Sequence, residues 1–249
     1  MTGQVAARGR IAPGAIVLPL LVVAAIAWTL TVRAGNGSMG MSAAAFVVAW
    51  IVMMVAMMLP AVAPVVALYA LAARRQLVAA VPVFVSGYLL VWAVSAVPAY
   101  AVAGAVNDPL MNGETWVQRV VGVTLLAAAV YQLSPLKAIC LRHCRSPLSF
   151  FTARTSSLRT VPAAFRAGVG HGLYCLGCCW ALMAILVVLG GMQLAWALAL
   201  AAIITLEKLA PGGPAIARVV AGAEGGLGLA IVISPGIVTH LISMPSMSM

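Results

Sequence analysis

Charged side chains are scarce in this sequence, and acidic ones are scarcer still. Only 7% of the 249 residues are charged, and Asp and Glu together number 4. A soluble domain is about a quarter charged, because its surface faces water. A soluble globular protein is therefore excluded, and the hydrophobic residues, which make up 64% of the chain, must face something other than water.

The usual signatures of catalysis are also missing from the sequence. It contains no Ser-His-Asp arrangement, no Gly-rich phosphate loop and no pair of catalytic carboxylates. Any enzymatic chemistry would have to run through a bound metal ion.

Long apolar blocks take the place of a polar surface. Each approaches or exceeds the roughly 20 residues that a helix needs to cross a membrane. They predict an all-α, polytopic bundle in one membrane-embedded domain, residues 1–249, with a flexible Met-rich tail over 236–249. Gly168 and Gly172, four residues apart, predict a close helix contact. We expect seven transmembrane helices, at 13–32, 44–72, 81–105, 116–136, 166–190, 192–210 and 214–235.

The basic residues predict the orientation of these helices. Lys and Arg number 14 and give a net charge of +10, but they are scattered between the apolar blocks. They lack the pattern of a nucleic-acid-binding module, so no nucleic-acid partner is expected. With the N-terminus in the cytoplasm and the C-terminus outside, the outer segments hold only Arg33 and Arg119, as the positive-inside rule requires. The cytoplasmic segments hold or adjoin the others: Arg8, Arg10, Arg74, Arg75, Lys137, Arg142, Arg145, Arg154, Arg159, Arg166, Lys208 and Arg218.

Cysteine and histidine gather in the predicted fifth span. Cys175, Cys178 and Cys179 follow His171 by one to two helical turns. Positions three or four apart share a helix face, so His171, Cys175 and one of the following two cysteines form a stripe. Thiolate and imidazole bind soft metal ions such as Cu(I). The stripe therefore predicts a metal site inside the membrane.

A second group of such residues, Cys140, His143 and Cys144, follows the fourth span on the predicted cytoplasmic side. Structural disulfides are not expected in a reducing compartment. We therefore expect this group to receive the ion at the cytoplasmic face. Two other interpretations of the cysteines stay open, namely packing as small hydrophobic residues and a thiol-redox or heme-related role.

Methionines recur one helical turn apart in the second span. Met53 pairs with Met57 and Met54 with Met58, just before Pro60. Thioethers are neutral and soft, so they can hold Cu(I) or Ag(I) weakly without burying an anion; gap filling between helices is the alternative. Further methionines, some with a histidine, lie outside the predicted spans at Met39, Met41, His240, Met244, Met247 and Met249.

The predicted topology orders these ligands by depth. Methionine lies outside and at mid-depth, cysteine and histidine lie deeper, and soft-ligand strength rises inward. A monovalent ion would also gain about 2.3 kcal/mol per 100 mV on moving inward.

Two acidic residues fall within predicted spans, where ionisable groups are rare and usually functional. Glu224 lies midway along the seventh span, and it could serve as a proton relay, an ion ligand or the partner of an arginine. If that span is instead two short pieces, Glu224 is an acid in a loop. Glu207 stands beside Lys208 near the inner end of the sixth span, where we expect an interfacial ion pair.

Four blocks of the sequence are distinctive: Trp50 to Pro60, Tyr131 to Lys137 with Cys140 to Pro147, His171 to Met183, and Glu207-Lys208. Together they resemble a bacterial family of predicted metal-binding integral membrane proteins, a domain-of-unknown-function family, over roughly residues 46–215. The resemblance implies a multi-span inner-membrane protein with a metal site, and it brings no settled activity. The Met-rich tail lies outside the matching blocks.

These patterns together predict a protein of the bacterial inner membrane that binds a soft metal ion, most plainly copper as Cu(I), for transport or delivery. The alternatives are a membrane metallo-oxidoreductase or an assembly factor for one, and a structural subunit of a membrane complex. The expected partners are the lipid bilayer, the metal ion, and either a second copy of the chain or another membrane protein.

Overall fold

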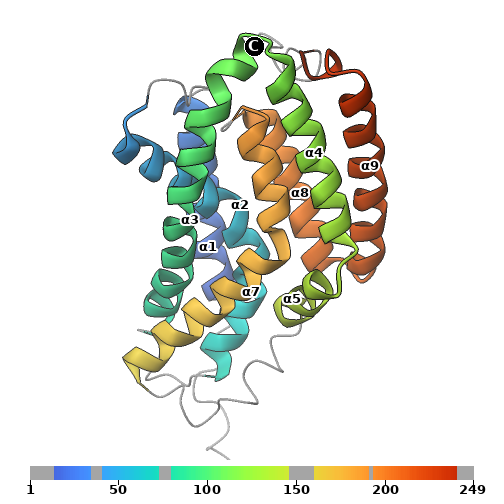
Figure 1. The fold of residues 1–249 in the computed structure, drawn as a ribbon. Helices are drawn as coiled ribbons and strands as arrows, with labels where there is room; N and C mark the ends of the chain where they lie inside the picture. The colour runs from blue at the N-terminus through green and yellow to red at the C-terminus, as the bar shows by residue number, and fades with distance from the viewer. Residues whose placement is uncertain (1–13, 35–40, 73–79, 146–159, 191–192, 240–249) are drawn as a thin grey trace, which may run out of the picture.

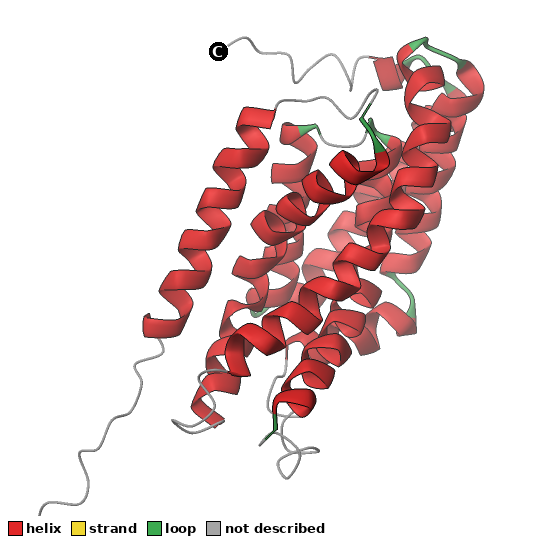
Figure 2. Cartoon of the chain, turned by 90° about the vertical axis from the view of Figure 1, so that its left-hand side faces the viewer, coloured by secondary structure: helices red, strands yellow, loops and turns green. Residues whose placement is uncertain are grey.

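The computed structural model describes residues 14–34, 41–72, 80–145, 160–190 and 193–239. Within these ranges the chain forms eight α-helices and no strand, so the all-α prediction is confirmed (Figures 1 and 2). The helices are α1 (Gly14–Ala34), α2 (Ala43–Ala72), α3 (Ala80–Met111), α4 (Thr115–Gln132), α5 (Pro135–Arg145), α7 (Val161–Val188), α8 (Leu194–Leu209) and α9 (Gly213–Ile233).

Five of these helices, α1, α2, α3, α7 and α9, are long and apolar enough to cross a membrane. The pair α4 and α5 counts as a sixth span when the two are taken together, although they meet at an angle of 66°. The prediction of a multi-span membrane protein is confirmed at this level.

The predicted sixth span, 192–210, corresponds to α8, which has 16 residues. At 1.5 Å per residue α8 measures about 24 Å, whereas the hydrocarbon core is about 30 Å thick. Seven spans and their orientation stay predictions.

Helix α7 lies in the middle of the bundle and packs against α3, α4, α5 and α8 (Figure 1). Its closest neighbour is α3, because Gly168 and Gly87 let the two backbones touch: a Cβ at Gly168 would overlap the carbonyl oxygen of Phe84. Gly172 lies one turn further along, against Tyr88 and Val91. The close contact predicted from the Gly168 and Gly172 spacing is therefore confirmed.

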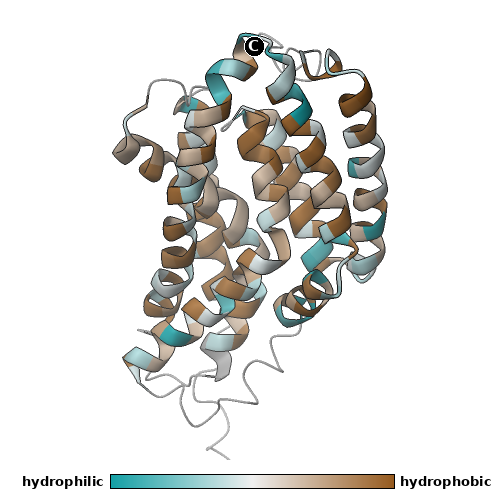
Figure 3. Cartoon of the chain, in the orientation of Figure 1, coloured by the Kyte–Doolittle hydropathy of each residue, from teal (hydrophilic) through white to brown (hydrophobic). Residues whose placement is uncertain are grey.

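The remaining helices surround this centre. Helix α2 packs against α1, α3 and α8, and α9 packs against α4. The helices are hydrophobic over most of their length, and hydrophilic residues gather around α5 and the adjoining end of α4 (Figure 3). A polar region thus lies next to α7 near one end of the bundle.

Parts of the sequence-based prediction fall outside the described residues. They include the Met-rich tail from His240 onward and Met39. Six of the basic residues that carried the orientation are also outside: Arg8, Arg10, Arg74, Arg75, Arg154 and Arg159. At the start of the predicted tail, Val238 is buried in the core.

Candidate metal centre

Helices α5 and α7 bring all five cysteines of the chain together. Each thiol is free and buried. The Cys144 Sγ of α5 lies 3.7 Å from the Cys178 Sγ of α7, and both thiols interact with that of Cys175. The two cysteine groups, which the sequence analysis placed at successive depths, therefore form a single cluster.

The bend between α4 and α5 makes this meeting possible. Leu133 and Ser134 leave the helix just before Pro135, as expected for a residue that precedes proline. Helix α5 then turns back against α7, where Gly177 has no side chain to hold it off: a Cβ there would lie 2.8 Å from the Cys140 Sγ. The Tyr131 hydroxyl of α4 also donates a hydrogen bond to the Gly177 carbonyl. The thiol cluster is thus supported by contacts from α4 and α5 to one turn of α7.

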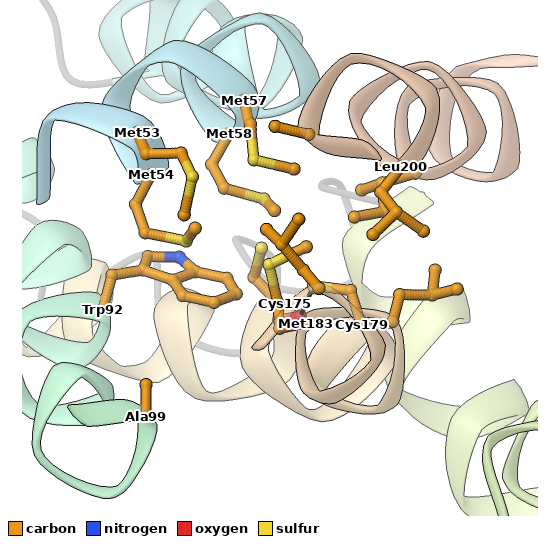
Figure 4. Packing of buried hydrophobic residues seen from close by; sticks show 14 of the residues in the cluster. Met53, Met54, Met57, Met58, Trp92, Ala99, Cys175, Cys179, Met183 and Leu200 are labelled. Carbon is orange, nitrogen blue, oxygen red and sulfur yellow. Dashed lines mark hydrogen bonds between the residues drawn. The ribbon is translucent and has the colours of Figure 1, made fainter. Parts of the chain in front are cut away.

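The four methionines of α2 face the same region. Met53, Met54, Met57 and Met58 are at most 1% exposed, so none points to the outside of the bundle. Figure 4 shows Met53 and Met54 beside the Trp92 ring of α3, and Met58 nearer to Cys175 of α7. All four methionines belong to one hydrophobic cluster with the cysteines. The methionine and cysteine groups therefore share one buried core, and direct contact between them stays a prediction.

Two further side chains complete this sulfur-rich region. Met183 of α7 and Trp92 of α3 lie beside the thiols and thioethers (Figure 4). The same two residues line an open apolar groove of about 960 Å³ between α3, α4 and α7. The groove therefore adjoins the methionine side of the cluster.

Cys175 has two polar neighbours that the sequence analysis did not assign to the site. The Lys208 ammonium of α8 donates a hydrogen bond to the Cys175 Sγ at 2.9 Å. The Tyr88 hydroxyl of α3 lies 3.0 Å from the same sulfur. A lysine within an apolar block is itself a signal of function, so Lys208 could have been found, whereas nothing in the sequence distinguishes Tyr88.

The two histidines of the predicted site take different positions. His171 is buried on α7 one turn before Cys175, with its ring 6.0 Å from that of Tyr88. His143 lies at the edge of α5, where its ring stacks on Tyr174 at a centroid distance of 4.3 Å. Its Nδ1 lies 2.9 Å from the Ile139 carbonyl oxygen. His171 is thus adjacent to the thiols, while His143 packs on the outer side of α7.

The prediction of an interfacial pair at Glu207 and Lys208 was wrong in its geometry. Both side chains are buried, and Glu207 pairs with Lys137 of α5 at 2.7 Å while Lys208 turns to Cys175. A charge in an apolar interior needs a partner, and α7 and α5 supply one for each residue. Gln132 donates to the other Glu207 oxygen at 3.2 Å.

Glu224 lies in the middle of a continuous α9, where it is 7% exposed. Its carboxyl group interacts with Gln132, Lys137 and Glu207. The predicted intramembrane acids Glu207 and Glu224 therefore form one buried polar group with Lys137 and Gln132.

A family profile described as copper chaperone matches residues 47–231, which contain all of the helices from α3 to α8 and most of α2 and α9. The chain belongs to the PpoB2 family of copper chaperones. No curated protein and no solved structure matches it.

Membership in the PpoB2 copper chaperone family confirms that this protein handles copper, and it supplies the function that the resemblance seen in the sequence had lacked. All of the residues discussed above, from Met53 to Glu224, lie inside the matched region.

The sulfur side chains of the cluster are suited to binding copper. Thiolates and thioethers are soft ligands that favour Cu(I), and the described core holds both kinds. Within the part of the chain that the structure describes, no three Cys, His, Asp or Glu side chains lie in an arrangement that could hold a metal ion without movement. Cu(I) accepts low coordination numbers, so a pair of thiols such as Cys144 and Cys178 is a sufficient starting point.

Proposed function

We propose that this copper chaperone binds Cu(I) inside the bacterial inner membrane at the thiols of α5 and α7 and passes it to an acceptor protein. The observation that supports this most directly is the 3.7 Å approach of Cys144 Sγ to Cys178 Sγ, two buried thiols from separate helices. Such a pair can close on one soft ion with small side-chain movements. Cys175, which interacts with both, is the third proposed ligand.

The methionines of α2 are proposed as the weaker binding station. Their thioethers carry no charge, so they can be buried without a counter-ion and can release Cu(I) readily. Thiolates bind Cu(I) more tightly, so an ion would move from the thioethers to the thiols. The burial of both groups in one hydrophobic core supports a transfer within the bundle.

Delivery is proposed over transport because the family is one of chaperones. A chaperone must release its ion to a partner, and a shared thiol site allows the partner's thiols to replace Cys144 or Cys178 one at a time. No step of this exchange changes the oxidation state of copper.

The test begins with purified protein kept under reducing conditions and loaded with Cu(I). Wild-type protein should retain copper against a weak chelator, and the variant with Cys144→Ser and Cys178→Ser should lose most of it. Met111→Leu is the matched control for sulfur loss, because Met111 lies exposed at the end of α3. If the double variant binds as much copper as wild type, the proposed site is wrong.

A second measurement separates delivery from transport. Protein in sealed vesicles is given Cu(I) on one side, with a copper-responsive dye inside and a soluble dithiol acceptor outside. Delivery predicts transfer to the acceptor with no dye signal. A dye signal that depends on Cys144 and Cys178 would instead support movement across the membrane.

A further inference from the structure

Lys208 is an unusual residue to find beside a soft-metal site. Its side chain is 7% exposed, in the last turn of α8, and its ammonium donates to the Cys175 Sγ at 2.9 Å. A lysine inside an apolar bundle is costly unless an opposite charge compensates it. Its presence therefore requires an explanation from its surroundings.

The surroundings of Lys208 are sulfur and phenol groups. The titratable groups that interact with it are Cys175, Cys178, Cys179 and Tyr88. The adjacent acid, Glu207, is engaged with Lys137 at 2.7 Å. Within the described residues, the positive charge of Lys208 is thus directed at the thiol cluster.

A count of charges shows what this arrangement favours. A monovalent ion bound by two thiolates, Cys175 and one of the other two proposed ligands, while the third thiol keeps its proton, carries a single negative charge, which the Lys208 ammonium cancels. One divalent ion held by the same two thiolates is already neutral, and the ammonium then leaves an uncompensated positive charge in the core. Net charge inside an apolar bundle is strongly disfavoured.

We infer that Lys208 is a specificity-determining residue that makes the thiol site selective for monovalent over divalent soft metal ions. The inference rests on the proposed function, because it assumes that the thiols of α5 and α7 hold the ion. Lys208 acts through Cys175 and is a positioning residue, since its ammonium contacts the ligand sulfur and does not itself bind a cation. Its fixed charge sets the preference, whatever route the ion takes to the site.

The experiment compares Ag(I) with Cd(II), which are both thiophilic and differ in charge. Each affinity is measured in competition with dithiothreitol, so that the intrinsic preference of a dithiol for each metal cancels. The readouts are the amount of metal retained and the thiolate-to-metal absorption. Wild-type protein is expected to favour Ag(I) over Cd(II) by more than dithiothreitol does.

Lys208→Gln removes the charge and should lower the Ag(I)-to-Cd(II) affinity ratio about 100-fold. Lys208→Arg keeps the charge and should retain most of the ratio. Lys137→Gln is the matched control: Lys137 is also a buried lysine, and its ammonium pairs with Glu207. This control should lower stability and leave the ratio unchanged.

Two results would overturn the inference. One is a Lys208→Gln protein whose ratio stays within about twofold of wild type. The other, which needs no variant to fold, is wild-type protein that favours Ag(I) no more than dithiothreitol does. Failure of the proposed function differs from both, because neither metal would then depend on Cys144, Cys175 or Cys178.

Discussion

The buried ion pair between Lys137 and Glu207 is expected to dominate the stability of the corner where α5 meets α8. The two charged atoms lie 2.7 Å apart, and each side chain is 2% exposed. Removing one partner of such a pair leaves a buried charge without compensation and costs about 3–5 kcal/mol. Replacing both partners by apolar residues is often neutral, because no charge then remains.

The two single variants should differ in a definite order. Lys137→Met leaves the interacting acids Glu207 and Glu224 without the Lys137 charge, so its loss should reach the upper end of that range. Glu207→Leu leaves the Lys137 ammonium with Glu224, so its loss should fall at the lower end. The double variant should recover most of the loss, which is the signature of a direct interaction.

The assay is reversible unfolding in mixed micelles with increasing sodium dodecyl sulfate, followed by helix circular dichroism. The unfolding free energies of wild type, both single variants and the double variant form the cycle. Arg218→Met is the control, because this exposed residue bonds only weakly to Pro214 and should change the free energy by less than about 0.5 kcal/mol. The reasoning fails if each single variant costs less than about 1 kcal/mol, the value of a solvated pair, or if the double variant equals the sum of the singles.

Three further perturbations test other contacts of the same bundle. Gly168→Ala should cost about 1–3 kcal/mol of unfolding free energy, because the new Cβ meets the Phe84 carbonyl. Gly222→Ala has open space around it and should stabilise α9 by up to about 1 kcal/mol. Equal effects of the two variants would contradict the close packing of α3 on α7. Tyr131→Phe removes the hydrogen bond to Gly177 and should cost about 0.6 kcal/mol, and at most about 1.7, in the same unfolding assay. Ag(I) at a hundredfold excess over its dissociation constant should stabilise the protein by about 2.7 kcal/mol, seen as a higher melting temperature with Ag(I) but not with Mn(II).

Much of the helical framework could be predicted from hydropathy, because each long span is an uninterrupted apolar run that must satisfy its backbone internally. The short α8 was harder. Pro211, Gly212 and Gly213 follow its end at Leu209, within one residue of the predicted end, but its 16 residues are fewer than the roughly 20 that a full span needs. A hydropathy window cannot separate a buried short helix from one that reaches both membrane surfaces.

The sulfur cluster was predicted by residue type and only partly by position. Soft side chains in helical register made Cys175, Cys178 and the methionines of α2 candidate ligands, since their spacing is a local property. The contact of Cys144 with Cys178 depends on the bend before Pro135, which sets the direction of α5 in space. His143 carries the same chemical signal as His171, and only packing on Tyr174 distinguishes it.

The adjacent positions of Glu207 and Lys208 have a consequence for the evolution of α8. Neighbouring residues on a helix point about 100° apart. The two contacts, Glu207 with Lys137 and Lys208 with Cys175, therefore fix how α8 is rotated about its own axis. Exchanging them, as Glu207→Lys with Lys208→Glu, would preserve composition, hydropathy and net charge, yet it would set an ammonium against Lys137 and a carboxylate against Cys175. A one-residue insertion or deletion between 194 and 206 would misdirect both at once. We therefore expect α8 to tolerate substitutions elsewhere along its length better than insertions or deletions.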